Sequence, residues 1–192
     1  MKIWLVEGNI NGRLCFDAED EMTNCSTLYN FHKKNRINDW KKIRVTFVST
    51  KKRKDILPIN NVTMFWSMSH LFVCDEYAKQ KISEKFNRIQ FLEVEPIEKD
   101  IAKKSNYYLA NVLDIIPGLY EDKCLFDYLD ETILLDVKKY SFKEIVKDYP
   151  IFYLKINEKP FSPVFATDEY KNYIEECGIT GFTFKEVFDF EK

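Results

Sequence analysis

Glycine and histidine are scarce in this sequence, and neither residue type forms a recognisable site motif. The five glycines form no GxGxxG or GxxxxGK[ST] motif of the kind that cradles phosphate groups. The two histidines, His32 and His70, lie far apart, and neither has a cysteine or carboxylate at metal-ligand spacing. HExxH and GxSxG are also missing. We therefore expect no catalytic residue, no bound metal and no cofactor, and we predict that the protein is not an enzyme.

The cysteines form no pattern that suggests disulfides or a zinc site. They are odd in number, widely scattered and without a CxxC pair: Cys15, Cys25, Cys74, Cys124 and Cys177. This usage is typical of reduced thiols in a cytoplasmic protein. No apolar run approaches the roughly 20 residues needed to cross a bilayer, and the first residues, MKIWLVEGNING, lack the apolar stretch of a secretory signal. We therefore predict a cytoplasmic protein that does not bind membranes.

Aromatic residues are abundant, at 16% of the chain, with 16 phenylalanines and 11 tyrosines. Most of them fall on alternating patterns, which favours an aromatic-rich core of strands over an exposed aromatic binding surface. At 192 residues, the chain is most simply one domain, residues 1–192, with possible lobes at 1–70 and 71–192. The sequence makes no prediction of the oligomeric state.

One block of the sequence occurs twice. Residues Phe72–Val94 and Phe165–Val187 align without a gap at an offset of 93 positions and share 7 of 23 residues. Each copy has the pattern of a strand, a helix and a second strand. The shared residues include no nucleophile, metal cluster or phosphate loop, so the repeat indicates scaffold instead of a site.

The start and end of the second repeat helix can be placed from its capping residues. Thr167 is expected to be the N-cap, and Asp168 and Glu169 then place negative charge at the positive end of the helix dipole. At the position of Thr167, the first copy has Cys74, a poor cap. Gly178 is expected to end the second helix in a left-handed conformation. Because carboxylates at a helix start are expected for these reasons alone, we favour a structural over a catalytic role for them.

The rest of the chain reads mainly as strands with few helices. Alternating or β-branched runs predict strands at Lys2–Val6, Ile43–Val48, Leu71–Val73, Asn106–Asp114, Thr132–Val137 and Ile151–Ile156. This pattern predicts an α+β fold, with a mixed, mostly antiparallel sheet, few helices and two similar strand-helix-strand units.

The net charge of −2 conceals a strong asymmetry. Ten basic residues lie between Lys33 and Lys54 against Asp39 alone, which leaves 19 basic and 30 acidic residues in the remainder. With Trp40 and Phe47, this basic segment has the composition of a nucleic-acid-binding surface. Lysines on an exposed strand also prevent edge-to-edge aggregation, and the acidic remainder would repel phosphate. Nucleic-acid binding by residues 33–54 is therefore the less favoured alternative.

Two acidic patches are candidates for binding a basic protein partner. The first consists of Asp17, Glu19, Asp20 and Glu21, in an expected loop. The second consists of Glu121, Asp122, Phe126, Asp127, Tyr128 and Asp130, interleaved with leucines. Acidic loops are usually only soluble loops, but an acidic loop that carries exposed aromatic residues fits a docking surface.

The C-terminal part of the chain carries a more distinctive pattern. It consists of a strand at Ile151–Leu154, then Val164–Tyr170 (VFATDEY), Ile174–Phe182 (IEECGITGF) and Phe184–Val187. This pattern resembles the C-terminal signature of bacterial immunity proteins that are encoded beside polymorphic toxins, a family once described only as a domain of unknown function. Segments upstream also fit, including Lys54–Leu57 and Asn106–Leu109, so the resemblance spans nearly the whole chain.

The resemblance implies a function in bacterial competition. Members of such a family bind and neutralise a cognate toxin in the cell that produces it, without catalytic residues or a cofactor. Residues that contact the toxin vary within such families, so none is carried over to this chain. The resulting hypothesis is a cytoplasmic immunity protein that occludes its toxin by tight, stoichiometric binding. A nucleic-acid-binding or regulatory module and an enzyme with an unrecognised carboxylate site remain the competing hypotheses.

Overall fold

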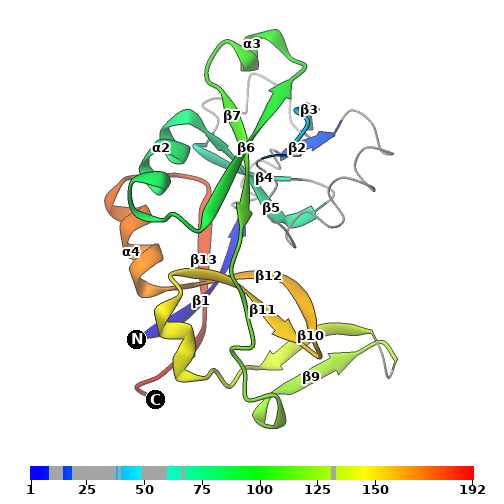
Figure 1. Cartoon of the computed structure of the whole chain (residues 1–192), viewed down its shortest axis with the longest axis vertical. Helices are drawn as coiled ribbons and strands as arrows, with labels where there is room; N and C mark the ends of the chain where they lie inside the picture. The colour runs from blue at the N-terminus through cyan, green and yellow to red at the C-terminus, as the bar shows by residue number, and fades with distance from the viewer. Residues whose placement is uncertain (9–14, 19–37, 39, 49–59, 66–67, 131–132) are drawn as a thin grey trace. The chain divides into compact units, whose positions relative to one another are not determined.

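The computed structural model describes residues 1–8, 15–18, 38, 40–48, 60–65, 68–130 and 133–192 (Figure 1). The chain divides into two compact units. Unit 1 consists of Met1–Val6, Asp114–Tyr173 and Phe184–Lys192, and unit 2 of Glu7–Leu113 and Ile174–Thr183. The lobe boundary suggested at residue 70 falls inside a strand of unit 2. The organisation as a single domain stays a prediction.

Unit 2 is built around a closed β-barrel. Its strands are β2 (Cys15–Ala18), β3 (Ile43–Val48), β4 (Val62–Phe65), β5 (Met68–Asp75), β6 (Ile89–Pro96) and β7 (Tyr107–Val112), in the order β2-β3-β6-β7-β5-β4. Helix α2 (Glu76–Lys85) and the short helix α3 (Lys99–Ala102) connect strands of this barrel. Closure removes the unpaired edges that an open sheet would expose. The buried core includes Val45, Val73, Leu92 and Leu109.

Unit 1 contains a five-stranded sheet and a separate two-stranded ribbon. The sheet has the order β13-β1-β12-β11-β8, formed by β1 (Lys2–Gly8), β8 (Ile115–Ile116), β11 (Ile151–Ile156), β12 (Lys159–Thr167) and β13 (Phe182–Asp189). The ribbon pairs β9 (Leu125–Tyr128) with β10 (Leu134–Lys139), and helix α4 (Asp168–Glu176) follows β12. Two 3-10 helices, η4 (Glu121–Lys123) and η5 (Glu144–Asp148), complete the unit. The aromatic core expected from the composition is present around Phe152 and Phe165.

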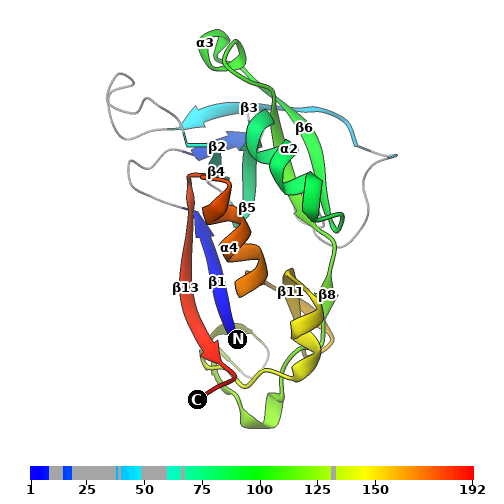
Figure 2. The ribbon, with the colours of Figure 1, turned by 90° about the vertical axis from the view of Figure 1, so that its left-hand side faces the viewer.

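The fold is α+β, as predicted, with few helices and mixed, mostly antiparallel sheets. Both repeats form strand-helix-strand units, β5-α2-β6 and β12-α4-β13. In each repeat, another strand lies between the two repeat strands in the sheet: β7 between β5 and β6, and β1 between β12 and β13. Figure 2 shows β13 beside β1. In the first repeat, the intervening strand β7 follows the repeat in the sequence. In the second repeat, the intervening strand β1 precedes it.

The helix starts differ from the prediction. The N-cap of α2 is Asp75, which accepts a hydrogen bond from the Ala78 N–H at 2.8 Å, so Cys74 is not at the capping position. Thr167 precedes α4, but its buried hydroxyl has no hydrogen-bond partner among the described residues, so its predicted capping bond is wrong. Thr167 still pairs with Ile3 in the sheet, which keeps its side chain buried in the core.

Asp168 has a different role from its repeat counterpart Asp75. One carboxylate oxygen of Asp168 accepts the Trp4 indole N–H at 2.7 Å, and the other accepts the Lys2 backbone N–H at 2.8 Å. Asp75 instead caps its own helix and accepts a bond from the Asn61 side chain. The repeated aspartates therefore fix neighbouring strands to the helix starts, which supports the structural interpretation of these carboxylates.

Replacing Thr167 by valine tests the corrected view of α4. Because the buried hydroxyl makes no hydrogen bond in the described structure, its removal should change the free energy of unfolding by less than about 1 kcal/mol and can stabilise the protein. Asp75→Ala removes a working N-cap and should cost about 1–2 kcal/mol. Guanidinium denaturation measures both variants. A larger loss for Thr167→Val than for Asp75→Ala would contradict this assignment.

The segment that carries the distinctive Gly-Ile-Thr-Gly-Phe pattern has a structural function. Gly178 has φ +65°, which confirms the predicted left-handed end of α4. Thr180 and Asn61 bind each other through backbone and side-chain hydrogen bonds of 3.0–3.2 Å. Gly181, at φ +107°, lies directly against the carbonyl of Val62. The pattern therefore fixes this segment to the start of β4.

Candidate functional site

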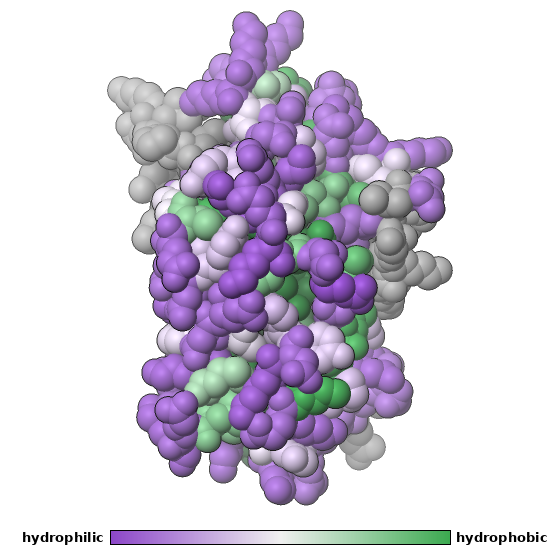
Figure 3. Space-filling model, turned by 60° about the vertical axis from the view of Figure 1, so that its left-hand side comes forward, coloured by the Kyte–Doolittle hydropathy of each residue, from purple (hydrophilic) through white to green (hydrophobic). Residues whose placement is uncertain are grey.

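Exposed large apolar side chains are concentrated around the β9–β10 ribbon. Five of the eight in the described residues lie on the ribbon or beside its connection: Leu125, Tyr128, Leu129, Ile133 and Leu135. We call these five residues the ribbon surface. Figure 3 shows another face of the molecule, where hydrophilic residues predominate and apolar residues form separate islands. A concentration of exposed apolar side chains is typical of a protein interaction site.

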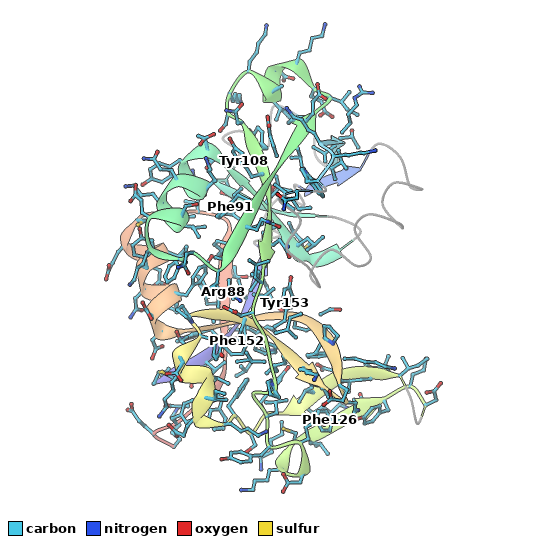
Figure 4. All side chains as sticks on the ribbon, in the orientation of Figure 1. Arg88, Phe91, Tyr108, Phe126, Phe152 and Tyr153 are labelled. Carbon is cyan, nitrogen blue, oxygen red and sulfur yellow. The ribbon has the colours of Figure 1, made fainter. Side chains whose placement is uncertain are left out.

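The ribbon is attached to unit 1 by its inner face. Val137 is buried in the hydrophobic core, and Phe126 and Leu134 pack partly buried against that core. Phe126 comes from β9 (Figure 4), and its ring lies 6.0 Å from that of Tyr128. A two-stranded ribbon can bury only one face on its own unit, so the opposite face stays exposed. Phe126 and Tyr128 lie on the same face of β9, where Phe126 is half-buried against the core and Tyr128 is 38% exposed.

The carboxylates of the second acidic patch have different environments. Asp127 forms an ion pair with Lys138 across the ribbon at 2.7 Å, and this hydrogen bond raises the pKa of Lys138. Asp130 accepts a hydrogen bond from the Ile133 N–H at 3.0 Å and thereby shapes the connection between the strands. Glu121 and Asp122 are exposed on η4. The patch thus contains both carboxylates that hold the ribbon and carboxylates that face solvent.

A groove of about 460 Å³ lies beside the ribbon within unit 1. Its lining comes from Leu134–Asp136 on β10 and from Ile156, Asn157 and Lys159–Pro163 at the β11–β12 hairpin. Ile156 belongs to the buried core, and Leu134 and Phe161 pack against the core, so the groove floor is continuous with it. The register of β12 shifts opposite Tyr153 and Leu154, which leaves Ser162 and Pro163 without partners on β11.

The tip of the β11–β12 hairpin has an unusual backbone. Asn157 and Glu158 have φ values of 47° and 61°, as in the type I′ turns that connect strands through two residues. The Asn157 side chain donates a hydrogen bond to the Tyr128 hydroxyl at 3.2 Å, which links the tip to the ribbon. Glu158 forms an ion pair with Lys155. Sequence reasoning missed Glu158, although the asparagine between two strand patterns is a signal for such a turn.

The first acidic patch lies mostly outside the described residues. Asp17 is part of strand β2, so its expected position in a loop is wrong. Glu19, Asp20 and Glu21 lie outside the described residues. Of the two candidate patches, only the second falls within the residues that the structure describes.

The described part of the basic segment is tied to the barrel. The Trp40 indole donates a hydrogen bond to the Glu93 carbonyl at 2.8 Å, and its ring packs against the core. Lys42 forms an ion pair with the Glu93 carboxylate at 2.6 Å. Trp40 and Lys42 therefore both have structural partners in the barrel. The remaining basic residues at 33–36 and 51–54 lie outside the described residues.

The described residues contain no arrangement of three or more histidine, cysteine or acidic side chains that could hold a metal ion. Glu76 is an example of a carboxylate that accepts hydrogen bonds from neighbouring side chains. Its hydrogen bonds, first from the Tyr108 hydroxyl and then from Lys79, lower the pKa of Glu76. Burial, together with the bond to Glu76, raises the pKa of Tyr108 to about 12. The described helices are all too short or too polar to cross a lipid bilayer.

Comparison with known proteins identifies the family. A search among curated proteins finds no match. The family model described as "Immunity protein family (Imm11)" matches residues 6–189, which is nearly the whole chain and includes the ribbon, the groove and both repeats. The chain therefore belongs to the Imm11 immunity protein family.

Proposed function

We propose that this protein neutralises a cognate bacterial toxin by binding it stoichiometrically and occluding its active surface in the cytoplasm of the producing cell. Membership of an immunity protein family supports the toxin as partner. The observation that carries the choice of surface is the concentration of exposed apolar residues on the ribbon. Apolar and aromatic anchors at the centre of an interface supply most of its binding free energy.

The charge distribution favours a basic toxin surface. Unit 1, which carries the ribbon, contains 15 acidic and 11 basic residues, whereas unit 2 contains 16 acidic and 18 basic residues. Glu121, Asp122, Asp127, Tyr128 and Asp130 would lie in or beside the contact, with Phe126 half-buried next to Tyr128. Complementary charge at the rim mainly accelerates association and selects the partner. Nucleic acid is a poor fit to this acidic unit because its phosphates are negative.

Leu129→Asp tests the ribbon surface because Leu129 is the most exposed large apolar residue described, at 68%. Binding of the toxin domain encoded beside this protein should weaken about 30-fold or more, since loss of an interface anchor costs 2 kcal/mol or more. Isothermal titration calorimetry measures the affinity, and circular dichroism checks that the variant is folded. Survival of cells that produce the toxin should fall in parallel.

The matched control is Ile145→Asp, the same change at an exposed apolar residue on η5, outside the ribbon. It should bind within about twofold of the native protein, because exposed residues outside the contact contribute little. Equal binding by Leu129→Asp and the native protein would exclude the ribbon as the contact. Absence of binding by the native protein would overturn the proposed function itself.

A further inference from the structure

We infer that the groove between β10 and the β11–β12 hairpin takes an extended segment of the toxin, with a bulky apolar side chain in the groove and an adjacent basic residue at Glu158. This inference rests on the proposed function and specifies its chemistry. Neither the groove nor Glu158 belongs to the acidic patches that the sequence singled out.

The groove floor is suited to an apolar side chain. Ile156 is 3% exposed and belongs to the core, while Leu134 and Phe161 pack against that core at its edge. An apolar side chain placed here would extend the hydrophobic core of unit 1 and remove the exposed atoms of Leu134 and Phe161 from water. The volume of about 460 Å³ leaves room for one large side chain together with part of its backbone.

The groove walls favour side-chain insertion over addition of a strand. On the β12 side, Pro160 and Pro163 have no backbone N–H to donate to an incoming strand. On the β10 side, the register shifts twice, between Leu134 and Asp136 and between Val137 and Lys139, which interrupts a regular edge. Both features are typical of edges that resist strand pairing. The occupant would therefore be recognised mainly by its side chains.

Glu158 occupies a position that a glycine would fill with less strain. The second residue of a type I′ turn is most often glycine, because the left-handed backbone clashes with a side chain. Glu158 adopts φ 61° there, and its side chain is 86% exposed. A strained residue that is not needed for packing is a candidate for a functional contact. At this tip, it presents a carboxylate next to the groove.

The charged residues at the groove are balanced, two acidic against two basic, so a basic occupant is favoured by the weakness of the Glu158 ion pair and by unit 1 as a whole. Asp136 lines one wall and Glu158 stands at the hairpin tip, while Lys159 lines the groove and Lys155 pairs with Glu158. Exposed ion pairs of this kind are weak, so a lysine or arginine of the toxin can replace Lys155 as the partner of Glu158. The excess of acidic residues in unit 1 favours the same partner.

Two substitutions at Glu158 separate the effect of backbone strain on stability from the effect of the carboxylate charge on toxin binding. Glu158→Gln keeps the backbone strain and removes the charge, so toxin binding should weaken about tenfold, with an unchanged melting temperature. Glu158→Gly removes both, so binding should weaken similarly while the melting temperature rises by about 2–4 °C. The control is Glu144→Gln, which removes an exposed carboxylate from a similar pair with Lys147 on η5 and should leave binding unchanged.

A third substitution tests the groove itself. Ser162 is exposed and lines the groove, so Ser162→Phe should fill it and weaken binding of the toxin domain about tenfold or more, whereas Ser162→Ala should not. Native binding by both Glu158→Gln and Ser162→Phe, with Leu129→Asp still impaired, would overturn this inference and leave the proposed function intact. Sedimentation equilibrium provides a further test. If Ser162→Phe converts a dimer into a monomer, the occupant is a second copy of this chain and the inference is wrong.

Discussion

Gly181→Ala should be among the most damaging single substitutions in this protein, lowering the free energy of unfolding by about 3–5 kcal/mol. A Cβ atom on Gly181 would lie 1.8 Å from the carbonyl oxygen of Val62, which is far inside van der Waals contact. The backbone at φ +107° is also one that residues with a side chain rarely adopt. The Thr180 carbonyl of the same segment accepts a hydrogen bond from the Val62 N–H at 3.0 Å, so a shift to relieve the clash would break that bond.

Gly178→Ala is the matched control for this effect. Gly178 also has a left-handed φ of +65°, but no atom lies within 4 Å of the position that its Cβ would occupy. Only the backbone penalty remains, which is about 1 kcal/mol. Guanidinium denaturation followed by circular dichroism measures both variants. Similar losses at the two glycines would show that the close approach to Val62 does not govern the stability of this segment.

Phe165→Ala should cost about 3–5 kcal/mol, the usual range for a fully buried phenylalanine. Phe165 is completely buried and lies in β12, the strand between β1 and β11. Its ring lies 5.5 Å from Tyr140, 5.8 Å from Phe142 and 6.0 Å from Phe152. Removing the ring therefore leaves a cavity where four aromatic side chains meet, and neighbouring strands limit how far the cavity can collapse.

Phe165→Leu fills most of that cavity with an apolar side chain and should cost less than about 2 kcal/mol. Thermal unfolding, with chemical denaturation as a second method, distinguishes the two variants. A loss for Phe165→Ala no larger than that for Phe165→Leu would mean that the aromatic cluster repacks freely. Toxin binding should be affected by either variant only through the folded fraction, because Phe165 has no exposed surface.

The strands could be predicted because their signal is local. Ile43–Val48 alternates β-branched residues, and the structure has β3 at these residues. Barrel closure could not be predicted, because it depends on the parallel pairing of β2 with β4 and of β3 with β6, whose partners are distant in the sequence. The error at Thr167 has a similar origin. Whether a hydroxyl caps a helix depends on its direction, and here the sheet pairing with Ile3 fixes that direction.

The candidate site was only partly accessible to sequence reasoning. The mixture of carboxylates and aromatic residues at 121–130 pointed to the ribbon, but alternation alone could not tell that Phe126 is half-buried whereas Tyr128, on the same face of β9, is 38% exposed. Register shifts at Leu135 and Lys138 also interrupt the two-residue period of β10. Glu158 was missed because what distinguishes it is its left-handed backbone angle, which cannot be predicted from the presence of a glutamate in the sequence.

The position of β1 has a consequence for synthesis of the protein in the cell. Ile3 pairs with Thr167, which leaves the ribosome 164 residues later, and β13 on the other side of β1 is made later still. At 5–20 residues per second, the first strand therefore waits roughly 10–30 s for its partners. Its apolar residues stay accessible to chaperones during that interval. Under the proposed function, protection against the toxin would begin only once translation is nearly complete.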